Sequence, residues 1–171
     1  TAPEHSPPMY SKQTETAIAS ASRLAEVYDG GVTKPSATAI ADSRGLQRPF
    51  VAKILTMLSQ AGLVSGLPGP GGGYTLAKPP KKIRLIDIYS LFEREDDTDL
   101  CPFGGGACGV ENPCPLHDKL VSVQDAMDQL LHETTLESFR AAFQEEGLRP
   151  VPKGAHPDGK RSTFHAAKSQ R

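Results

Sequence analysis

The sequence predicts a mainly α-helical fold that contains one small β-hairpin. Three observations support this prediction. Apolar residues recur at helical spacing in several separate stretches, and a segment rich in glycine and proline near residue 70 separates two short strand-like runs. The chain also contains no tryptophan and only four tyrosines and six phenylalanines. Aliphatic packing between helices must therefore supply most of the core.

The first helix is expected from about Ser11 to Asp29. Its apolar positions form one stripe, which consists of Ala17, Ile18, Ala21, Leu24, Ala25 and Tyr28. Two glycines follow directly and are expected to end the helix. Glu15 lies in the first turn, where a carboxylate favours the helix dipole. Residues 1–8, which precede this helix, are predicted to be an unstructured leader.

Two helices joined by a sharp turn are expected next. Ser36 is a suitable cap for a short helix that contains Ile40, and Gly45 supplies the turn. The second helix, over 47–61, turns Val51, Ile54, Leu55 and Leu58 inward. This order predicts a helix-turn-helix, whose second helix can enter the major groove of DNA. The candidate DNA-contacting residues are Ser36, Gln47, Arg48, Lys53 and Thr56; the alternative is that they form the solvated face of an ordinary helical hairpin.

A β-hairpin is expected directly after the second helix. Leu63 and Val64 begin one strand, and the returning strand begins at Tyr74 after a loop too rich in glycine and proline to be helical. A hairpin in this place predicts a winged helix. The loop adds four candidates for close approach to DNA, namely Gly71, Gly72, Gly73 and Tyr74, although the glycines could equally form a flexible tip. Residues 83–92 are expected to pack back on the domain as a strand end and a short helix.

A long helix is predicted in the second half of the chain. Its apolar residues form a seam with spacings of four, three, four and three, made of Leu116, Leu120, Val123, Met127 and Leu130. This seam is long enough to pair with a second copy, and the acidic outer face favours that interpretation over burial in the protein's own core. The run Thr134, Thr135, Leu136, Glu137 resembles a capping box that restarts a helix.

The chain concentrates its cysteines between residues 100 and 118, at Cys101, Cys108 and Cys114. Thiolates favour zinc, copper(I) or iron-sulfur clusters, which excludes calcium and magnesium. The segment lacks the C-x-x-C spacing usual in structural zinc sites, and its wider gaps suit a cluster, which normally takes four protein ligands. The fourth ligand is His117, if a helix begins near Pro113, or a carboxylate from elsewhere in the fold. The alternatives to a cluster are a disulfide with a spare thiol, a set of reactive thiols, and a zinc site.

Charge is divided along the chain. Residues 1–92 carry ten basic and six acidic side chains, residues 93–146 carry three and thirteen, and residues 147–171 carry six and one. Contact with DNA phosphates is therefore expected in the first part. The predicted organisation is the leader at 1–8, a DNA-binding domain at 9–92, a cysteine loop at 93–118, dimerisation helices at 113–146 and a basic disordered tail at 147–171.

The composition also bears on location and on enzyme activity. The chain has no long apolar run and no signal peptide, so a cytoplasmic protein with reduced thiols is expected. No activated nucleophile, paired acid and base, or phosphate-loop signature is present. The sequence therefore predicts a protein that is not an enzyme.

The order of these elements, with the runs A-G-L-V, G-P-G-G-G-Y-T-L-A and K-P-P-K-K-I-R-L-I-D-I ahead of the cysteines, resembles the Rrf2 family of bacterial transcription regulators. The similarity covers roughly residues 9–143 and is to the iron-sulfur cluster-binding IscR and NsrR type. It implies a winged-helix homodimer that binds palindromic operators and changes affinity with the state of a two-iron or four-iron cluster. It implies that the three cysteines hold the cluster. It offers two fourth ligands: His117, as in IscR-like members, or Glu15, donated by the partner subunit, as in NsrR-like members.

The chain departs from the family pattern in three places. Pro68 occupies the position of a common wing arginine, Ala52 lies where a longer polar residue is frequent, and the first gap between cysteines is one residue longer. The function implied is that of a transcription regulator, a repressor, that senses nitric oxide, redox state or iron-sulfur status. One alternative is a winged-helix regulator whose cysteines form a thiol switch or a zinc site. The other is a small redox protein that carries a cluster.

Overall fold

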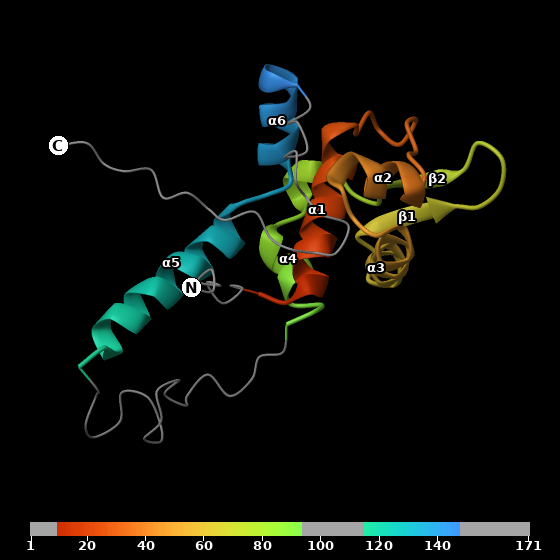
Figure 1. Ribbon diagram of the computed structural model, residues 1–171. Helices are drawn as coiled ribbons and strands as arrows, with labels where there is room; N and C mark the ends of the chain where they lie inside the picture. The colour runs from red at the N-terminus through yellow and green to blue at the C-terminus, as the bar shows by residue number, and fades with distance from the viewer. Residues whose placement is uncertain (1–9, 94–114, 148–171) are drawn as a thin grey trace, which may run out of the picture.

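Helices and one antiparallel hairpin make up the part of the protein that the computed structural model describes, residues 10–93 and 115–147 (Figure 1). The first part contains α1 (Lys12–Glu26), α2 (Ala37–Arg44), α3 (Arg48–Gln60), β1 (Val64–Leu67), β2 (Gly73–Leu76), the 3-10 helix η1 (Pro80–Lys82) and α4 (Leu85–Tyr89). The second part contains α5 (His117–Glu133) and α6 (Glu137–Glu146). This mostly helical fold with one hairpin confirms the predicted fold class.

Helix α1 forms where its apolar stripe predicted it. Ser11 caps its start, because the Ser11 hydroxyl accepts a hydrogen bond from the Thr14 N–H at 3.3 Å. Four residues of the predicted stripe are buried, namely Ala17, Ala21, Leu24 and Ala25. The helix ends at Glu26, slightly earlier than expected, and the two glycines beyond it have positive φ angles.

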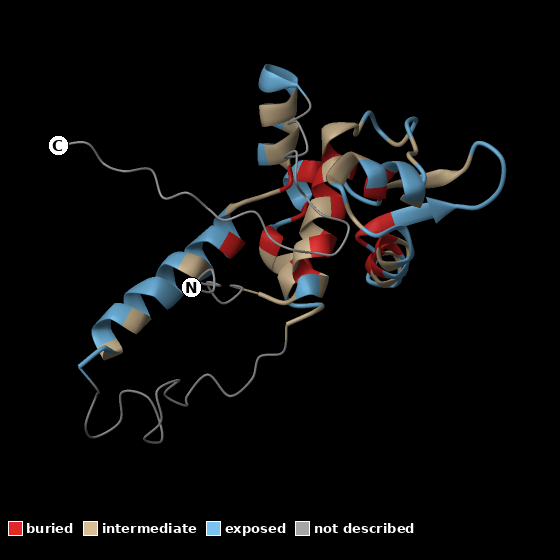
Figure 2. Cartoon of the chain, in the orientation of Figure 1, coloured by how far each residue is buried: buried red, intermediate tan, exposed pale blue. Residues whose placement is uncertain are grey.

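The turn between α2 and α3 depends on one left-handed residue. Gly45 has a φ of 62°, and the Leu46 N–H donates to the Ala41 carbonyl at 2.9 Å. The chain then enters α3, whose inward side chains are fully buried, as predicted: Val51, Ile54, Leu55 and Leu58. Figure 2 shows the buried residues gathered where α1, α3, α4 and the start of the hairpin meet.

An ionic network fastens α2 to α1. The Glu26 carboxylate accepts from Arg44 at 2.6 Å and from Arg23 at 3.1 Å. Arg44 also donates to the Ala19 carbonyl at 3.2 Å and to the Ser22 hydroxyl at 3.0 Å. These groups are largely buried and share their hydrogen bonds. Removal of one partner would therefore leave a buried charge unpaired, which typically lowers the free energy of unfolding by about 3 kcal/mol or more.

The hairpin is the predicted wing. β1 and β2 pair antiparallel, with Val64 opposite Leu76 and Leu67 opposite Gly73. The wing glycines differ in what surrounds them. A Cβ added to Gly72 would lie 2.0 Å from the Leu67 carbonyl oxygen, and one added to Gly73 would lie 2.1 Å from the Lys34 carbonyl oxygen. A Cβ at Gly71 would meet nothing within 4 Å, so of the three consecutive glycines only this one has open surroundings, as Gly69 has earlier in the loop.

The second part of the chain joins the first through main-chain hydrogen bonds. The Leu85 N–H donates to the Thr134 carbonyl at 2.9 Å, and the Leu136 N–H donates to the Ile83 carbonyl at 2.9 Å. Thr135 forms a β-bridge with Arg84. The predicted capping box at the start of α6 is therefore wrong: the chain at Thr134 and Thr135 is held by main-chain pairing with residues 83–85, and Leu136 precedes the helix without a side-chain cap.

Helix α5 projects from the rest of the protein (Figure 1). It begins at His117 rather than near Pro113, which lies outside the described residues, as does Cys114. Within α5 only Leu131 is buried, whereas Val123 is 67% exposed and Leu130 is 49% exposed. The predicted seam is thus largely uncovered in a single chain. None of the described helices is long and apolar enough to cross a membrane.

Helix α6 returns to the domain and packs against α1. The Arg23 guanidinium lies 5.7 Å from the centre of the Phe143 ring, a distance suited to a cation–π interaction. Arg23 also binds Glu26, so the same arginine contacts both the ionic network and α6. The C-terminal helix is in this way linked to the pair of helices that precedes the wing.

We predict that Gly73→Ala destabilises the fold by about 3 kcal/mol, because its Cβ would collide with a main-chain oxygen that cannot move away easily. Gly71→Ala is the matched control. Its φ of 75° strains an alanine, but its surroundings are open, so we expect a loss of only about 1 kcal/mol. Chemical denaturation measures both values, and equal losses would contradict the assigned role of Gly73.

Candidate nucleic-acid interface

Helix α3 presents a polar face opposite its buried one. Lys53, Thr56 and Gln60 recur on this exposed side at spacings of three and four residues. Lys53 makes no ion pair within the described residues, so its charge is available to an external anion. The Thr56 hydroxyl donates to the Ala52 carbonyl at 3.0 Å and keeps its lone pairs for a donor outside the helix.

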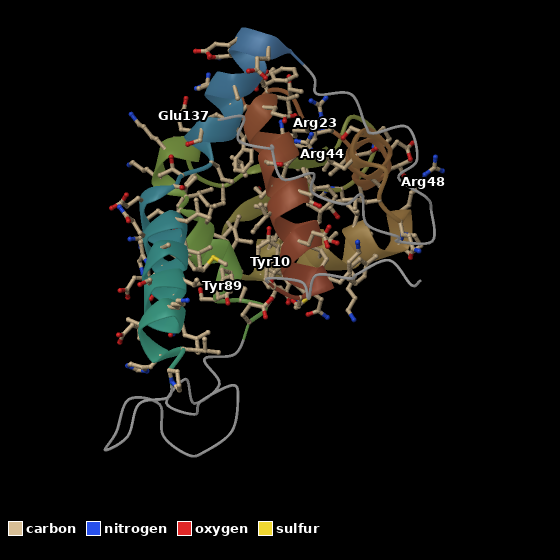
Figure 3. The ribbon with its side chains drawn as sticks, turned by 60° about the vertical axis from the view of Figure 1, so that its left-hand side comes forward. Tyr10, Arg23, Arg44, Arg48, Tyr89 and Glu137 are labelled. Carbon is tan, nitrogen blue, oxygen red and sulfur yellow. The ribbon has the colours of Figure 1, made fainter. Side chains whose placement is uncertain are left out.

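Arg48, at the first turn of α3, is held by a carboxylate that the sequence did not single out. Its Nε and one Nη bind the two oxygens of Asp42 at 2.9 and 3.0 Å. The hydrogen bond to Asp42 and the charge of Asp42 raise the pKa of Arg48. Both side chains are more than half exposed, at 63% and 52%. In Figure 3 Arg48 lies on the side of the molecule away from α5.

Ser36 and Gln47 lie where the two helices of the pair begin. The Ser36 hydroxyl accepts from the Ala39 N–H at 3.1 Å, so it caps α2. Gln47 immediately precedes α3 and is exposed. The two residues mark the outward ends of α2 and α3, and each remains a candidate for a contact with DNA.

Tyr74 is engaged within the wing. A Cβ on Gly66 would lie 3.1 Å from the Tyr74 ring, so the ring covers the opposite strand. The Tyr74 N–H donates to the Pro35 carbonyl at 2.9 Å, which ties β2 to the segment before α2. The aromatic side chain therefore stiffens the hairpin, whereas Gly71 leaves the main chain of the tip accessible.

The chain that leads into the cysteines is fastened to the start of α1. Glu93 is the last described residue before them, and its carboxylate accepts from the Ser11 N–H at 2.7 Å and from the Thr14 hydroxyl. Burial acts to raise the pKa of Glu93, but these hydrogen bonds outweigh it and hold the pKa below its usual 4.5. Cys101, Cys108 and Cys114 themselves lie outside the described residues.

The two candidate fourth ligands are separated in a single chain. Glu15 lies in the first turn of α1, 3.5 Å from the Lys12 ammonium. His117 is the first residue of α5, at the end of that helix that projects from the domain (Figure 1). Within residues 10–93 and 115–147, no group of three or more His, Cys, Asp or Glu side chains is arranged to hold a metal ion.

Two features of this region escaped sequence analysis. Asp42 lies six residues before Arg48, across a tight glycine turn, so its proximity could have been inferred from the turn itself. The contact between Glu93 and Ser11 could not be inferred in this way, because 82 positions of sequence separate the two residues.

Comparison with known proteins identifies relatives of this chain. A family model described as Rrf2, iron-dependent transcriptional regulator, matches residues 10–142. A protein of Aquifex aeolicus described as an HTH-type transcriptional regulator is 33% identical over 114 residues, which are 66% of this chain and 78% of the relative.

Two solved structures share the fold. CymR, the global cysteine regulator of B. subtilis, superposes with a TM-score of 0.62 at 23% identity, over 78% of this chain and 97% of CymR. IscR of T. potens superposes with a TM-score of 0.61 at 22% identity, over 82% of this chain and 92% of IscR. At these identities the likeness demonstrates the fold alone.

We predict that Glu93→Gln lowers the free energy of unfolding at pH 7 by about 1 kcal/mol, because the amide accepts the two hydrogen bonds less strongly than a carboxylate. Since the folded-state pKa of Glu93 lies below 4.5, the wild-type advantage is complete above pH 4.5 and disappears as the pH falls through the folded-state value. Denaturation between pH 3 and 7 measures it, with Glu145→Gln on α6 as the control. A difference that does not change with pH would contradict this role.

We predict that Asp42→Asn strengthens binding to double-stranded DNA by up to about fivefold at low salt. It removes a carboxylate that repels phosphates and competes for Arg48, and solvent screening of these exposed charges limits the gain to about fivefold. Fluorescence anisotropy measures this affinity, and Asp125→Asn on α5 is the control with the same change of charge. Weaker binding by Asp42→Asn would show that Asp42 supports the interface instead.

Proposed function

The chain belongs to the Rrf2 family of transcriptional regulators, and from this premise we propose that it is a DNA-binding repressor whose affinity for its operator is set by an iron-sulfur cluster. Its relatives are regulators and not enzymes. The observation that carries the proposal is the exposed polar face of α3 next to a wing with an accessible tip. The sensing part of the proposal rests on the chain's three cysteines, which all lie in the segment between this domain and α5.

DNA binding is supported by how α3 is oriented. Its four buried aliphatic residues hold one face in the core, so Lys53 and Thr56 must face outward. The wing follows at once, since the Leu63 N–H donates to the Leu58 carbonyl at 3.0 Å and starts β1 at the end of α3. A helix and a hairpin in this order can contact the major groove and the adjacent backbone of one duplex.

A homodimer is supported by the uncovered seam of α5. Leu116, Val123 and Leu130 are exposed, and a contiguous apolar strip of this kind marks a contact surface. Its heptad spacing fits a second copy of the same helix. We therefore propose that α5 and α6, within 113–146, form the dimer interface and that two recognition helices read a palindromic operator.

The donor set fits an iron-sulfur cluster. Three thiolates from Cys101, Cys108 and Cys114 are soft ligands, and Glu15 or His117 would complete the usual four. Glu15 lies in the first turn of α1, where it forms an ion pair with the partly exposed Lys12, and His117 is the first residue of the projecting helix α5, so each candidate lies at the beginning of a helix. When bound, the cluster supplies a centre that reacts with nitric oxide and oxidants.

Contacts at both ends of the cysteine segment support coupling to DNA binding. Before it, Glu93 binds the start of α1, which packs against α2 and α3. After it, α5 leads to the main-chain hydrogen bonds between Leu85 and Thr134. A change in the order of the segment therefore acts on the elements that hold the recognition helix.

We predict that protein purified without oxygen absorbs visible light and contains iron and acid-labile sulfide in matched amounts. Replacement of any one cysteine by serine should abolish the absorbance. A DNA site selected from a random pool should bind cluster-loaded and cluster-free protein with affinities that differ by about 5- to 150-fold. The comparison is made over a range of salt concentrations, because phosphate contacts depend on salt.

Other outcomes identify the alternatives. A colourless protein that binds zinc, or one whose DNA affinity responds only to thiol oxidation, would replace the cluster with a zinc site or a thiol switch. A coloured protein without sequence-specific DNA binding would indicate a small redox protein. Glu15→Gln and His117→Ala then assign the fourth ligand, since only loss of a true ligand should change the cluster spectrum.

A further inference from the structure

The segment between α1 and α2 lies against the wing. The Pro35 carbonyl accepts the Tyr74 N–H at 2.9 Å, and the Lys34 carbonyl lies where a Cβ on Gly73 would be. A Cβ on Gly31 would lie 3.8 Å from the Thr75 side chain. These contacts follow β2 along its length, on the edge that β1 leaves unpaired (Figure 1). The chain before α2 is thus a structural part of the wing.

This segment is held at both ends. At its start, the Asp29 carboxylate accepts from the Val32 N–H at 2.9 Å, from the Thr33 N–H at 2.9 Å and from the Thr33 hydroxyl at 2.6 Å. At its end, Ser36 caps α2. The main chain of Lys34 is therefore held between the turn at Asp29, the wing and the start of α2. The position of the Lys34 Cα atom relative to the wing is fixed by these contacts.

The wing carries no cation of its own. Residues 61–77, which include both strands and the loop, contain no Lys, Arg, Asp or Glu. The nearest charge in sequence is Lys78, which follows the end of β2 farther from the tip. Lys34 instead abuts Gly73, at the end of β2 nearer the tip. These contacts place the main chain of Lys34 beside the outer part of the wing, from which its long side chain can reach the DNA backbone next to the hairpin.

The charge on Lys34 is not neutralised by its neighbours. Lys34 makes no ion pair within the part of the chain that the structure describes. The nearby Asp29 uses both carboxylate oxygens in hydrogen bonds to Val32 and Thr33, which lower its pKa. A wing that approaches a duplex without a cation would gain little from the phosphates, and a lysine docked on its edge supplies that attraction.

We propose that Lys34 is the phosphate-binding cation of the wing, contributed by the α1–α2 segment rather than by the hairpin. It binds the DNA backbone beside the wing and positions the hairpin on the duplex without reading base sequence. The inference rests on the proposed DNA-binding function. It adds a positioning residue that the pattern of the helix-turn-helix and the hairpin does not reveal.

The test measures DNA affinity as a function of salt concentration for Lys34→Gln, Lys34→Arg and the wild type. We expect Lys34→Gln to bind operator and unrelated DNA more weakly by a similar factor, and its slope of log affinity against log salt to be smaller by about 1. Lys34→Arg should restore most of both. Lys119→Gln on α5 makes the same change of charge away from the wing and should leave the slope unchanged.

The outcomes separate this inference from the proposed function. A wild-type protein that binds no DNA under any condition overturns the proposed function and the inference together. A wild-type protein that binds DNA, with a Lys34→Gln slope equal to that of Lys119→Gln, overturns the role of Lys34 alone. Lys34→Gln should keep the wild-type melting temperature, since within the described residues the Lys34 side chain makes no ion pair and the contact with Gly73 comes from its main chain. If Lys34→Arg fails to restore the slope while remaining folded, the charge of Lys34 is not what binds.

Discussion

The burial of one face of α3 is the interaction on which the arrangement of this protein depends. Val51, Ile54, Leu55 and Leu58 lose all contact with water, and burial of an aliphatic side chain of this size contributes about 2 kcal/mol. This fixes the rotation of the helix about its own axis. The polar residues on the other face are therefore held outward by the core, and the wing starts where the last buried turn ends.

Sequence patterns predicted the elements whose cause is local. Helical spacing located α1, α3 and the seam of α5, and single residues with special geometry, such as Gly45, located the turn. Contacts between distant segments were not predictable in this way. The Glu93 carboxylate meets the Ser11 N–H across 82 residues, and Thr135 pairs with Arg84 through main-chain groups that every sequence contains. The second of these contacts also explains why the predicted capping box does not form, since a strand-like pairing uses the same residues.

The wing shows how one pattern can have two physical causes. Three consecutive glycines suggested close approach of the main chain to DNA, and Gly71 has the open surroundings that this requires. Gly72 and Gly73 are needed instead because other carbonyl groups of the protein occupy the space of a side chain. From sequence alone the two causes look identical. At Gly72 the neighbour is the Leu67 carbonyl within the wing, whereas at Gly73 it is the Lys34 carbonyl, almost forty residues earlier in the sequence.

The attachment of α5 has a mechanical consequence. The helix has 17 residues and is therefore about 25 Å long, but among the described residues it is anchored at its C-terminal end, by buried Leu131 and by the Leu85–Thr134 hydrogen bond. It is a lever with its pivot beside α4. A rotation of about 10° at the pivot would move the far end, at His117, by about 4 Å. Conversely, if His117 is displaced by a few ångströms, α5 rotates slightly about its anchored end beside α4. The force on the anchoring contacts is then larger than the force applied at His117.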